Sequence, residues 1–155
     1  MKTTPLMLAL LCGALALPAA HAATTAKLKK PVAAVKAPAA QEKVLYHIND
    51  SAVARVALRN IENHLGASAD TKIVVVTHGK GIDFLLNDAK DDKGAYASQV
   101  AGLKEKGVEF RVCRNTLQGR NLDDGAVIME AQVVPSGVAE IGRLQSREGF
   151  VYLKP

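Results

Sequence analysis

Cysteine, glycine, proline and aromatic residues are all scarce in this chain. Its 155 residues include two cysteines, 12 glycines, six prolines, three tyrosines, three phenylalanines and no tryptophan. These low numbers exclude a disulfide-stapled miniprotein and a collagen-like repeat, and they argue against a base-stacking nucleic-acid platform. The remainder is ordinary globular composition, with 48% apolar and 23% charged residues. That composition excludes disorder across the whole chain and fits one modest domain.

The first 22 residues have the pattern of a secretory signal peptide. Lys2 precedes an apolar run over 6–17, and the small-residue pattern Ala20-His21-Ala22 follows it. This run of about a dozen residues is shorter than the roughly 20 that a membrane-spanning helix needs. The sequence therefore predicts that 1–22 is removed after Ala22, leaving a periplasmic protein with no membrane span. Two alternatives are an uncleaved anchor and a lipoprotein acylated at Cys12.

Residues 23–42 have the composition of a disordered linker. They are almost entirely Ala, Lys, Pro and Thr, and such a segment buries too little apolar surface to offset its ordering entropy. The net charge of +5 lies largely outside the rest of the chain, because residues 43–155 hold 15 basic and 14 acidic side chains. The folded part is therefore close to neutral, and its charge gives no support to a nucleic-acid partner.

From residue 43 onward, β-rich runs alternate with helical patterns. Apolar and β-branched runs predict strands at 43–48, 73–77, 108–113, 132–134 and 150–153. Helices are predicted between them, at 53–65, 82–86, 95–106 and from 136 to 149, with a loop at 91–94 and weak helical propensity over 115–129. This alternation predicts an α/β three-layer sandwich with a mainly parallel five-stranded sheet over 43–155.

In a parallel sheet, the carboxyl ends of the strands share one edge, and ligands bind in the crevice there. The residues that follow the predicted strands are therefore candidate binding residues: Asn49, Asp50, His78, Gly79, Arg114, Asn115, Ser136 and Gly137. Ser136 is also suited to cap the helix that follows it. No pair of histidine and cysteine residues has the spacing of a metal site, so the sequence predicts no metal and no cofactor.

Cys113 is the candidate catalytic residue. It lies between a strand end and a helical turn, beside Arg111 and Arg114, and helix N–H groups or nearby cations stabilise a thiolate. The alternative is a cysteine that packs at the sheet edge. His78 would pair with the thiol if their strands are neighbours, and otherwise would bond to the backbone. His47, inside the first strand, is interpreted as structural.

Two further motifs resemble known sites only weakly. Gly79-Lys80-Gly81 follows a buried strand, but Phe84 stands where a dinucleotide fingerprint has its third glycine. A tight turn is therefore predicted at 79–81. Ser136 lacks the flanking glycines of a hydrolase nucleophile elbow, because Val134 occupies the first of those positions.

Three segments resemble the exported branch of the DsrE/DsrF-like, or YchN-like, family. They are IVVVTHGKGIDFLL at 73–86, GVEFRVCRNTL at 107–117 and VPSGVAEI at 134–141, and the resemblance extends over essentially all of 43–155. It implies a flavodoxin-like fold, a homo-oligomer that is a trimer or hexamer, and a role in sulfur metabolism. A sulfur donor or acceptor protein is the partner that it implies.

The resemblance carries over to the cysteine in part. Cys113 matches a cysteine common in the YchN-like branch, where a second often follows three residues later; here that position is Thr116. The persulfide-carrying cysteine of the sulfur-relay members lies in a loop that corresponds to 91–96, where this chain has none. Two hypotheses follow. Either Cys113 carries sulfane sulfur, or the protein is a non-catalytic oligomeric module that binds a small ligand and Cys113 is structural.

Overall fold

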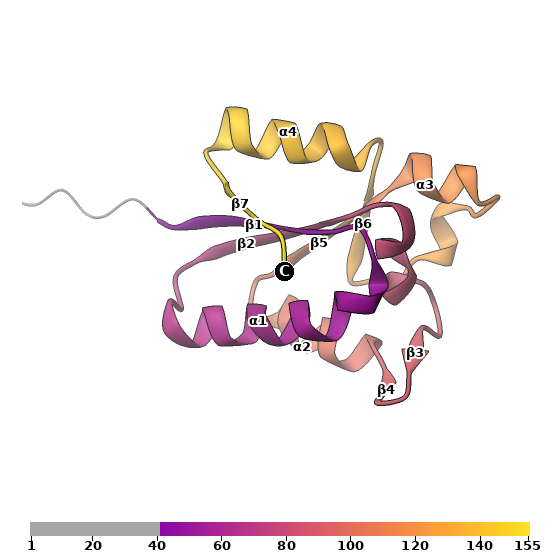
Figure 1. Ribbon diagram of the computed structural model, residues 1–155, viewed down its shortest axis with the longest axis horizontal. Coiled ribbons are helices and arrows are strands. Elements are labelled where there is room, and N and C mark those ends of the chain that lie inside the picture. Colours follow the sequence, from indigo (N-terminus) through magenta and orange to yellow (C-terminus); the bar gives the residue numbers. More distant parts are fainter. Residues whose placement is uncertain (1–40) are drawn as a thin grey trace, which may run out of the picture. The chain divides into compact units, whose positions relative to one another are not determined.

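Residues 41–155 are described by the computed structural model shown in Figure 1. The predicted signal peptide and the predicted linker up to residue 40 lie outside the described residues. The first two described residues contact the domain: the Gln41 side chain donates to the Asp70 carbonyl at 2.8 Å, and Glu42 accepts from the Thr71 hydroxyl at 2.9 Å. Within 41–155, no helix is long and apolar enough to cross a membrane.

Five parallel strands form the central sheet. In spatial order they are β6 (Ala131–Val134), β5 (Glu109–Cys113), β2 (Lys72–Thr77), β1 (Lys43–Ile48) and β7 (Val151–Leu153). Every neighbouring pair in this order is parallel. The predicted α/β fold with a five-stranded sheet is therefore confirmed, and all five carboxyl ends lie at one edge, as the candidate site requires.

Helices cover both faces of this sheet (Figure 1). α1 (Ala54–Ala67) and α2 (Ala97–Glu105) lie on one face, and α4 (Gly137–Glu148) lies on the other. α1 buries four residues at helical spacing, Ala54, Ala57, Leu58 and Ile61, which is the apolar stripe of a helix that packs on a sheet. α4 contributes Leu144 to a smaller apolar cluster on its own face, made with Leu45, Val74, Val76 and Phe150.

A small hairpin occupies the region predicted as a loop at 91–94. β3 (Lys90–Asp91) and β4 (Gly94–Ala95) pair antiparallel. Arg55 of α1 fixes this hairpin, since its guanidinium donates to both carboxylate oxygens of Asp91, at 2.8 and 2.9 Å. Such a long-range bidentate contact is not visible in the local sequence pattern. The loop predicted at 91–94 is the turn of this hairpin at 92–93, and the prediction missed the strand pairing of Asp91 with Gly94.

The helix predicted at 82–86 and the region of weak helical propensity at 115–129 both contain short helices in the structure. η2 (Gly79–Leu85), a 3-10 helix, replaces the helix predicted at 82–86 and begins three residues earlier. The region 115–129 contains α3 (Arg114–Gly119) and the 3-10 turn η3 (Asp124–Ala126). Because α3 starts directly after β5, the last residue of the strand lies at the N-terminus of a helix.

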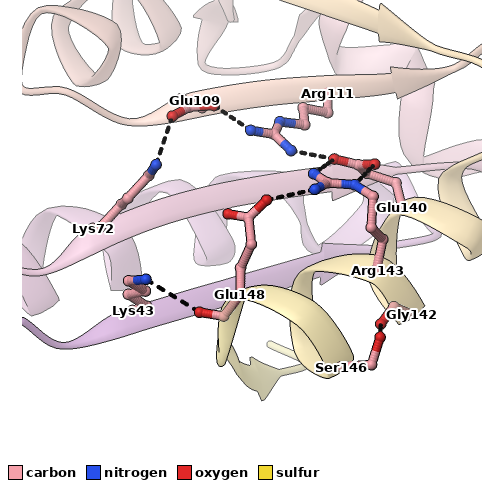
Figure 2. A network of polar contacts seen from close by, with 9 residues as sticks. All are labelled: Lys43, Lys72, Glu109, Arg111, Glu140, Gly142, Arg143, Ser146 and Glu148. Atoms are coloured by element: carbon pink, nitrogen blue, oxygen red, sulfur yellow. Dashed lines mark hydrogen bonds and ion pairs between the residues drawn. The ribbon is translucent and has the colours of Figure 1, made fainter.

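An ion-pair network fastens α4 to the sheet (Figure 2). Glu140 of α4 pairs with Arg111 of β5 and accepts two hydrogen bonds from Arg143, at 2.8 and 2.9 Å. Arg111 also pairs with Glu109, which lies 3.5 Å from the ammonium of Lys72. The side chains of Arg111 and Glu140 are each 12% exposed, so this contact is largely withdrawn from water. The network therefore holds α4 over β5. Gly137, the first residue of α4, lies against Cys113.

Candidate active site at Cys113

Cys113 is the last residue of β5 and lies on the face of the sheet that α4 covers. Arg111, two residues earlier, contacts Glu140 of α4, and residues two apart in a strand share a face. The cysteine is free and 5% exposed. Its neighbour on β6 is Val134. The thiol is thus enclosed where β5 gives way to α3.

Four N–H and hydroxyl donors favour the thiolate form of Cys113. They are the backbone N–H groups of Gly137, Thr116 and Asn115 and the hydroxyl of Thr116. Burial raises the pKa of the Cys113 thiol, but the donors favour the thiolate more strongly, so the pKa lies below its ordinary value of 9.0. The sequence prediction that helix N–H groups reach this thiol agrees with this arrangement, and the first turns of both α3 and α4 supply them.

Gly137 is the point at which α4 touches the site. A Cβ atom at this position would lie 3.1 Å from the Cβ of Cys113 and 3.2 Å from the Cβ of His78. Only a residue without a side chain lets the N-terminus of α4 approach so closely. Ser136 caps the helix, as predicted, because its hydroxyl accepts from the N–H of Ala139 at 3.4 Å. Cap and glycine together place the Gly137 N–H on the sulfur.

Thr116 connects the cysteine to the end of β2. Its hydroxyl oxygen accepts from the Gly79 N–H at 3.1 Å, and its hydroxyl hydrogen is therefore available to Cys113. Gly79 has φ +58, in the left-handed region that favours glycine. The predicted tight turn at 79–81 is thus present, and it contributes to the site by holding Thr116.

His78 lies beside Cys113, because β2 and β5 are neighbours and Thr77 pairs with Val112. Its ring, however, is turned toward β1, where the Nε2 of His78 lies 2.7 Å from the Nε2 of His47. The Nδ1 of His47 in turn lies 2.6 Å from the Tyr152 hydroxyl. Burial, followed by the nearby His78 and Lys154, lowers the pKa of His47 to about 4. His47 is therefore neutral at pH 7.

Of three further predicted site residues, two are engaged elsewhere and one is exposed. The Arg114 guanidinium is held by the carboxylate of Asp124, at 3.1 and 2.5 Å, and contact with Asp124 raises the pKa of this arginine further. Asp50 caps η1 (Ser51–Val53) by accepting from the Ala52 N–H at 3.0 Å. Asn49 is exposed. The thiolate is therefore favoured by N–H and hydroxyl donors, without a cation from Arg114.

A pocket of about 370 Å³ lies apart from Cys113. It is lined by Asp50, Ser51, Ala52, Asp83, Phe84, Ala89, Lys90, Asp91 and Tyr96. Two of its carboxylates are already paired, Asp91 with Arg55 and Asp83 with Arg120. We assign the chemistry to the Cys113 cluster rather than to this pocket, because the cluster joins a nucleophile to donors that stabilise its anion.

No group of three or more His, Cys, Asp or Glu side chains within 41–155 is arranged to hold a metal ion. His47 and His78 form a pair in which the two Nε2 atoms are hydrogen-bonded to each other. The site as described therefore consists of a thiol, its N–H and hydroxyl donors, and the two histidines.

The family model for DsrE/DsrF-like proteins matches residues 42–155. The chain belongs to this family. The solved structure of MTH1491, a protein of unknown function from Methanobacterium thermoautotrophicum, shares 29% sequence identity at a TM-score of 0.68, covering 74% of this chain and 100% of that one. The YchN protein of E. coli shares 14% identity at a TM-score of 0.57, covering 73% of this chain and 99% of its own. A search of curated proteins found no match.

Membership of the DsrE/DsrF-like family supports a sulfur-related role, and the likeness to YchN shows the fold alone. The resemblance noted in the sequence is thus confirmed at the level of the family. Three residues of the site were not among the predicted site residues: His47, Thr116 and Tyr152. Side chains alternate between the two faces of a strand, so Leu45 and His47 lie on the same face of β1. This alternation was the one feature of the sequence that could have indicated that His47 faces the site.

Proposed function

We propose that this DsrE/DsrF-like protein binds and carries sulfane sulfur as a persulfide on Cys113. The observation that carries the proposal is the position of Cys113 at the first turns of α3 and α4, whose N–H groups, with the Thr116 hydroxyl, favour its thiolate. A cysteine that merely packs at a sheet edge does not need them, because a neutral thiol is a weak hydrogen-bond acceptor. A thiolate does need them, and the thiolate is the form that attacks another sulfur atom.

The loading step is a transfer of sulfur between thiols. The Cys113 thiolate forms a bond to the outer sulfur of a donor persulfide, and the sulfur–sulfur bond of the donor breaks. The electron pair of that bond leaves on the inner sulfur, which takes up a proton to become a thiol. The products are Cys113 persulfide and the donor thiol, with no net oxidation. The free cysteine is 5% exposed, so its sulfur is largely shielded from bulk solvent before loading.

Sulfur loading tests this proposal directly. The full chain with Cys12→Ser, which leaves Cys113 as its thiol, is incubated with glutathione persulfide and its intact mass is recorded. We expect an adduct of about 32 Da, removed by dithiothreitol, because a persulfide is reversible where sulfinic and sulfonic acids are not. The matched variant Cys12→Ser, Cys113→Ser should show no adduct. Equal adducts on both chains, or none on either, would contradict the proposal.

We also propose that the protein is exported to the periplasm and assembles as a homo-oligomer. Export is supported by the leader pattern of 1–22, with its small-residue site before Ala23. Assembly is supported by family resemblance. Native mass spectrometry of protein recovered from the producing cells tests both proposals, with Ala23 as the expected first residue and a trimer or hexamer as the expected mass. An intact Met1, or a monomer, would contradict the corresponding proposal.

A further inference from the structure

A row of hydrogen-bonded side chains leads across the sheet to Cys113. It consists of Tyr152 on β7, His47 on β1 and His78 directly after β2, and Cys113 lies on the next strand, β5. His78 and Cys113 are adjacent at the ends of their strands, on either side of Gly137. The four side chains therefore follow the strand order β7-β1-β2-β5 without a gap.

Both links of the row have hydrogen-bond distances. The Tyr152 hydroxyl lies 2.6 Å from Nδ1 of His47, and Nε2 of His47 lies 2.7 Å from Nε2 of His78. The two ends of the row differ in exposure, since Cys113 is 5% exposed and Tyr152 is 40% exposed. The row thus connects an enclosed thiol with a side chain that reaches solvent.

We infer that His78 takes the proton of the Cys113 thiol and returns it to the departing donor sulfur, and that His47 and Tyr152 are positioning residues for His78. The inference rests on the proposed function, because it concerns the proton that sulfur loading must move. His78 is the imidazole next to the cysteine, and imidazole is the side chain most often used for such transfers.

The proposed transfer requires one tautomer of His78, because the 2.7 Å distance between the two Nε2 atoms fits a hydrogen bond in either direction. A neutral imidazole has one N–H group and one acceptor nitrogen. If Nε2–H of His78 donates to Nε2 of His47, then Nδ1–H of His47 donates to the Tyr152 oxygen, and each atom in the row has a partner. Nδ1 of His78 is then left as the basic atom. This nitrogen lies close to its own Cβ, which flanks Gly137 opposite Cys113.

The complete step balances in atoms and electrons. Nδ1 of His78 takes the thiol proton, and the resulting Cys113 thiolate bonds to the outer sulfur of a low-molecular-weight persulfide. The sulfur–sulfur bond of that donor breaks, and the inner sulfur leaves with the electron pair. His78 then returns the proton to this inner sulfur. The sulfane sulfur keeps its oxidation state, so the step needs no oxidant or reductant.

Several charged groups near the row can influence how the rate of sulfur uptake depends on pH. Lys154, after β7, acts on His47 electrostatically and disfavours its protonation. Cys113 faces the row from β5. From α4, the nearby titratable side chain is Glu140, which is ion-paired with Arg111. A change in pH profile on removal of His47 therefore reports on the row itself, provided that these groups are left intact.

The test is the rate of sulfur uptake from glutathione persulfide by the full chain carrying Cys12→Ser. His78→Ala should slow uptake about 100-fold at pH 7, the lower end of what a positioned acid–base group contributes, and added imidazole should restore part of the rate. His47→Val and Tyr152→Phe should slow it less and change the shape of its pH profile. His64→Gln is the matched control, because His64 also bonds to a tyrosine, Tyr46 at 3.0 Å.

The outcomes separate this inference from the proposed function. No uptake by the unmutated site would overturn the proposed function itself. Normal uptake together with an unchanged rate in His78→Ala, or a slow rate that imidazole does not restore, would overturn the role of His78 alone. If His78→Ala does not fold, Tyr152→Phe provides the test, because position 152 is exposed and the substitution keeps the aromatic ring. A pH profile of Tyr152→Phe equal to that of His64→Gln would then contradict the inference.

Discussion

Replacing Gly81 with alanine is expected to destabilise the domain by more than about 4 kcal/mol, the range of the most damaging single substitutions. A Cβ atom at Gly81 would collide with the backbone of β1, since it would lie 2.6 Å from the carbonyl carbon of Ile48 and 2.8 Å from the Cα of Asn49. Real Cβ atoms do not approach backbone this closely, and backbone of a central strand cannot move aside cheaply. Either η2 or the end of β1 must be displaced.

Urea unfolding followed by circular dichroism measures this effect. The matched control is Gly142→Ala in α4, where a new Cβ atom has nothing within 4 Å. That change should stabilise the protein by about 0.5–1 kcal/mol, because alanine favours a helix interior. Equal stability of the two variants would show that η2 does not cross β1 as closely as described.

The second large effect is expected from Glu140→Gln. Glu140 accepts from Arg143 and pairs with Arg111, and the side chains of Glu140 and Arg111 are each only 12% exposed. Neutralising Glu140 removes the carboxylate that Arg111 and Arg143 share and leaves Arg111 with Glu109 as its ionic partner. Losing charge-assisted hydrogen bonds of this kind costs about 1.5–3 kcal/mol. We expect a loss of this size in urea unfolding at pH 7. Arg114→Gln is the control, since the pair of Arg114 with Asp124 is exposed and its loss should have a far smaller effect.

The same substitution predicts a dependence on pH with a definite sign. The hydrogen bond from Arg143, with the pairing to Arg111, holds the pKa of Glu140 below its ordinary value of 4.5. A carboxyl whose pKa is lower in the folded protein stabilises it above the ordinary pKa and ceases to do so as the pH falls. The difference between the two proteins should therefore be complete above about pH 4.5 and narrow below it. A constant difference down to pH 3 would contradict this account.

Local patterns were sufficient to predict the architecture. The unbroken β-branched run at 73–77 identified a strand buried on both faces, and its neighbours followed from the alternation of strands and helices. The end of the strand at Cys113 was also readable, because strand propensity stops there and a helical turn begins. Both predictions depend on residues adjacent in sequence, where propensity and periodicity apply.

Contacts between distant residues were not predictable in this way. The pairing of His47 with His78 depends on β1 and β2 being neighbours in register. Tyr152 joins them because β7 is the edge strand that pairs with β1 on the side opposite β2. Arg114 was expected near the thiol but is held by Asp124, ten residues further along. The hairpin at 90–95 likewise depends on Arg55, which comes from α1. Such contacts follow from tertiary geometry, which single-sequence patterns do not contain.

The functional consequence of the α4 network is indirect. Glu140 and Arg111 do not touch the sulfur; they hold the helix whose first N–H, from Gly137, donates to Cys113. Thr116 acts at closer range, since its hydroxyl and its N–H both favour the thiolate. The reactivity of the cysteine therefore reports on the whole arrangement, and on Thr116 most directly.

The rate of Cys113 alkylation as a function of pH tests the central claim most directly. It is measured on the folded full chain with Cys12→Ser, beside the same chain carrying Thr116→Val, with Thr116→Ser as the matched control. We predict that the apparent pKa of Cys113 lies below 9.0, that Thr116→Val raises it by removing a hydroxyl donor, and that Thr116→Ser leaves it close to the starting value. A thiol that reacts only after unfolding, or whose titration is the same in all three chains, would contradict the account.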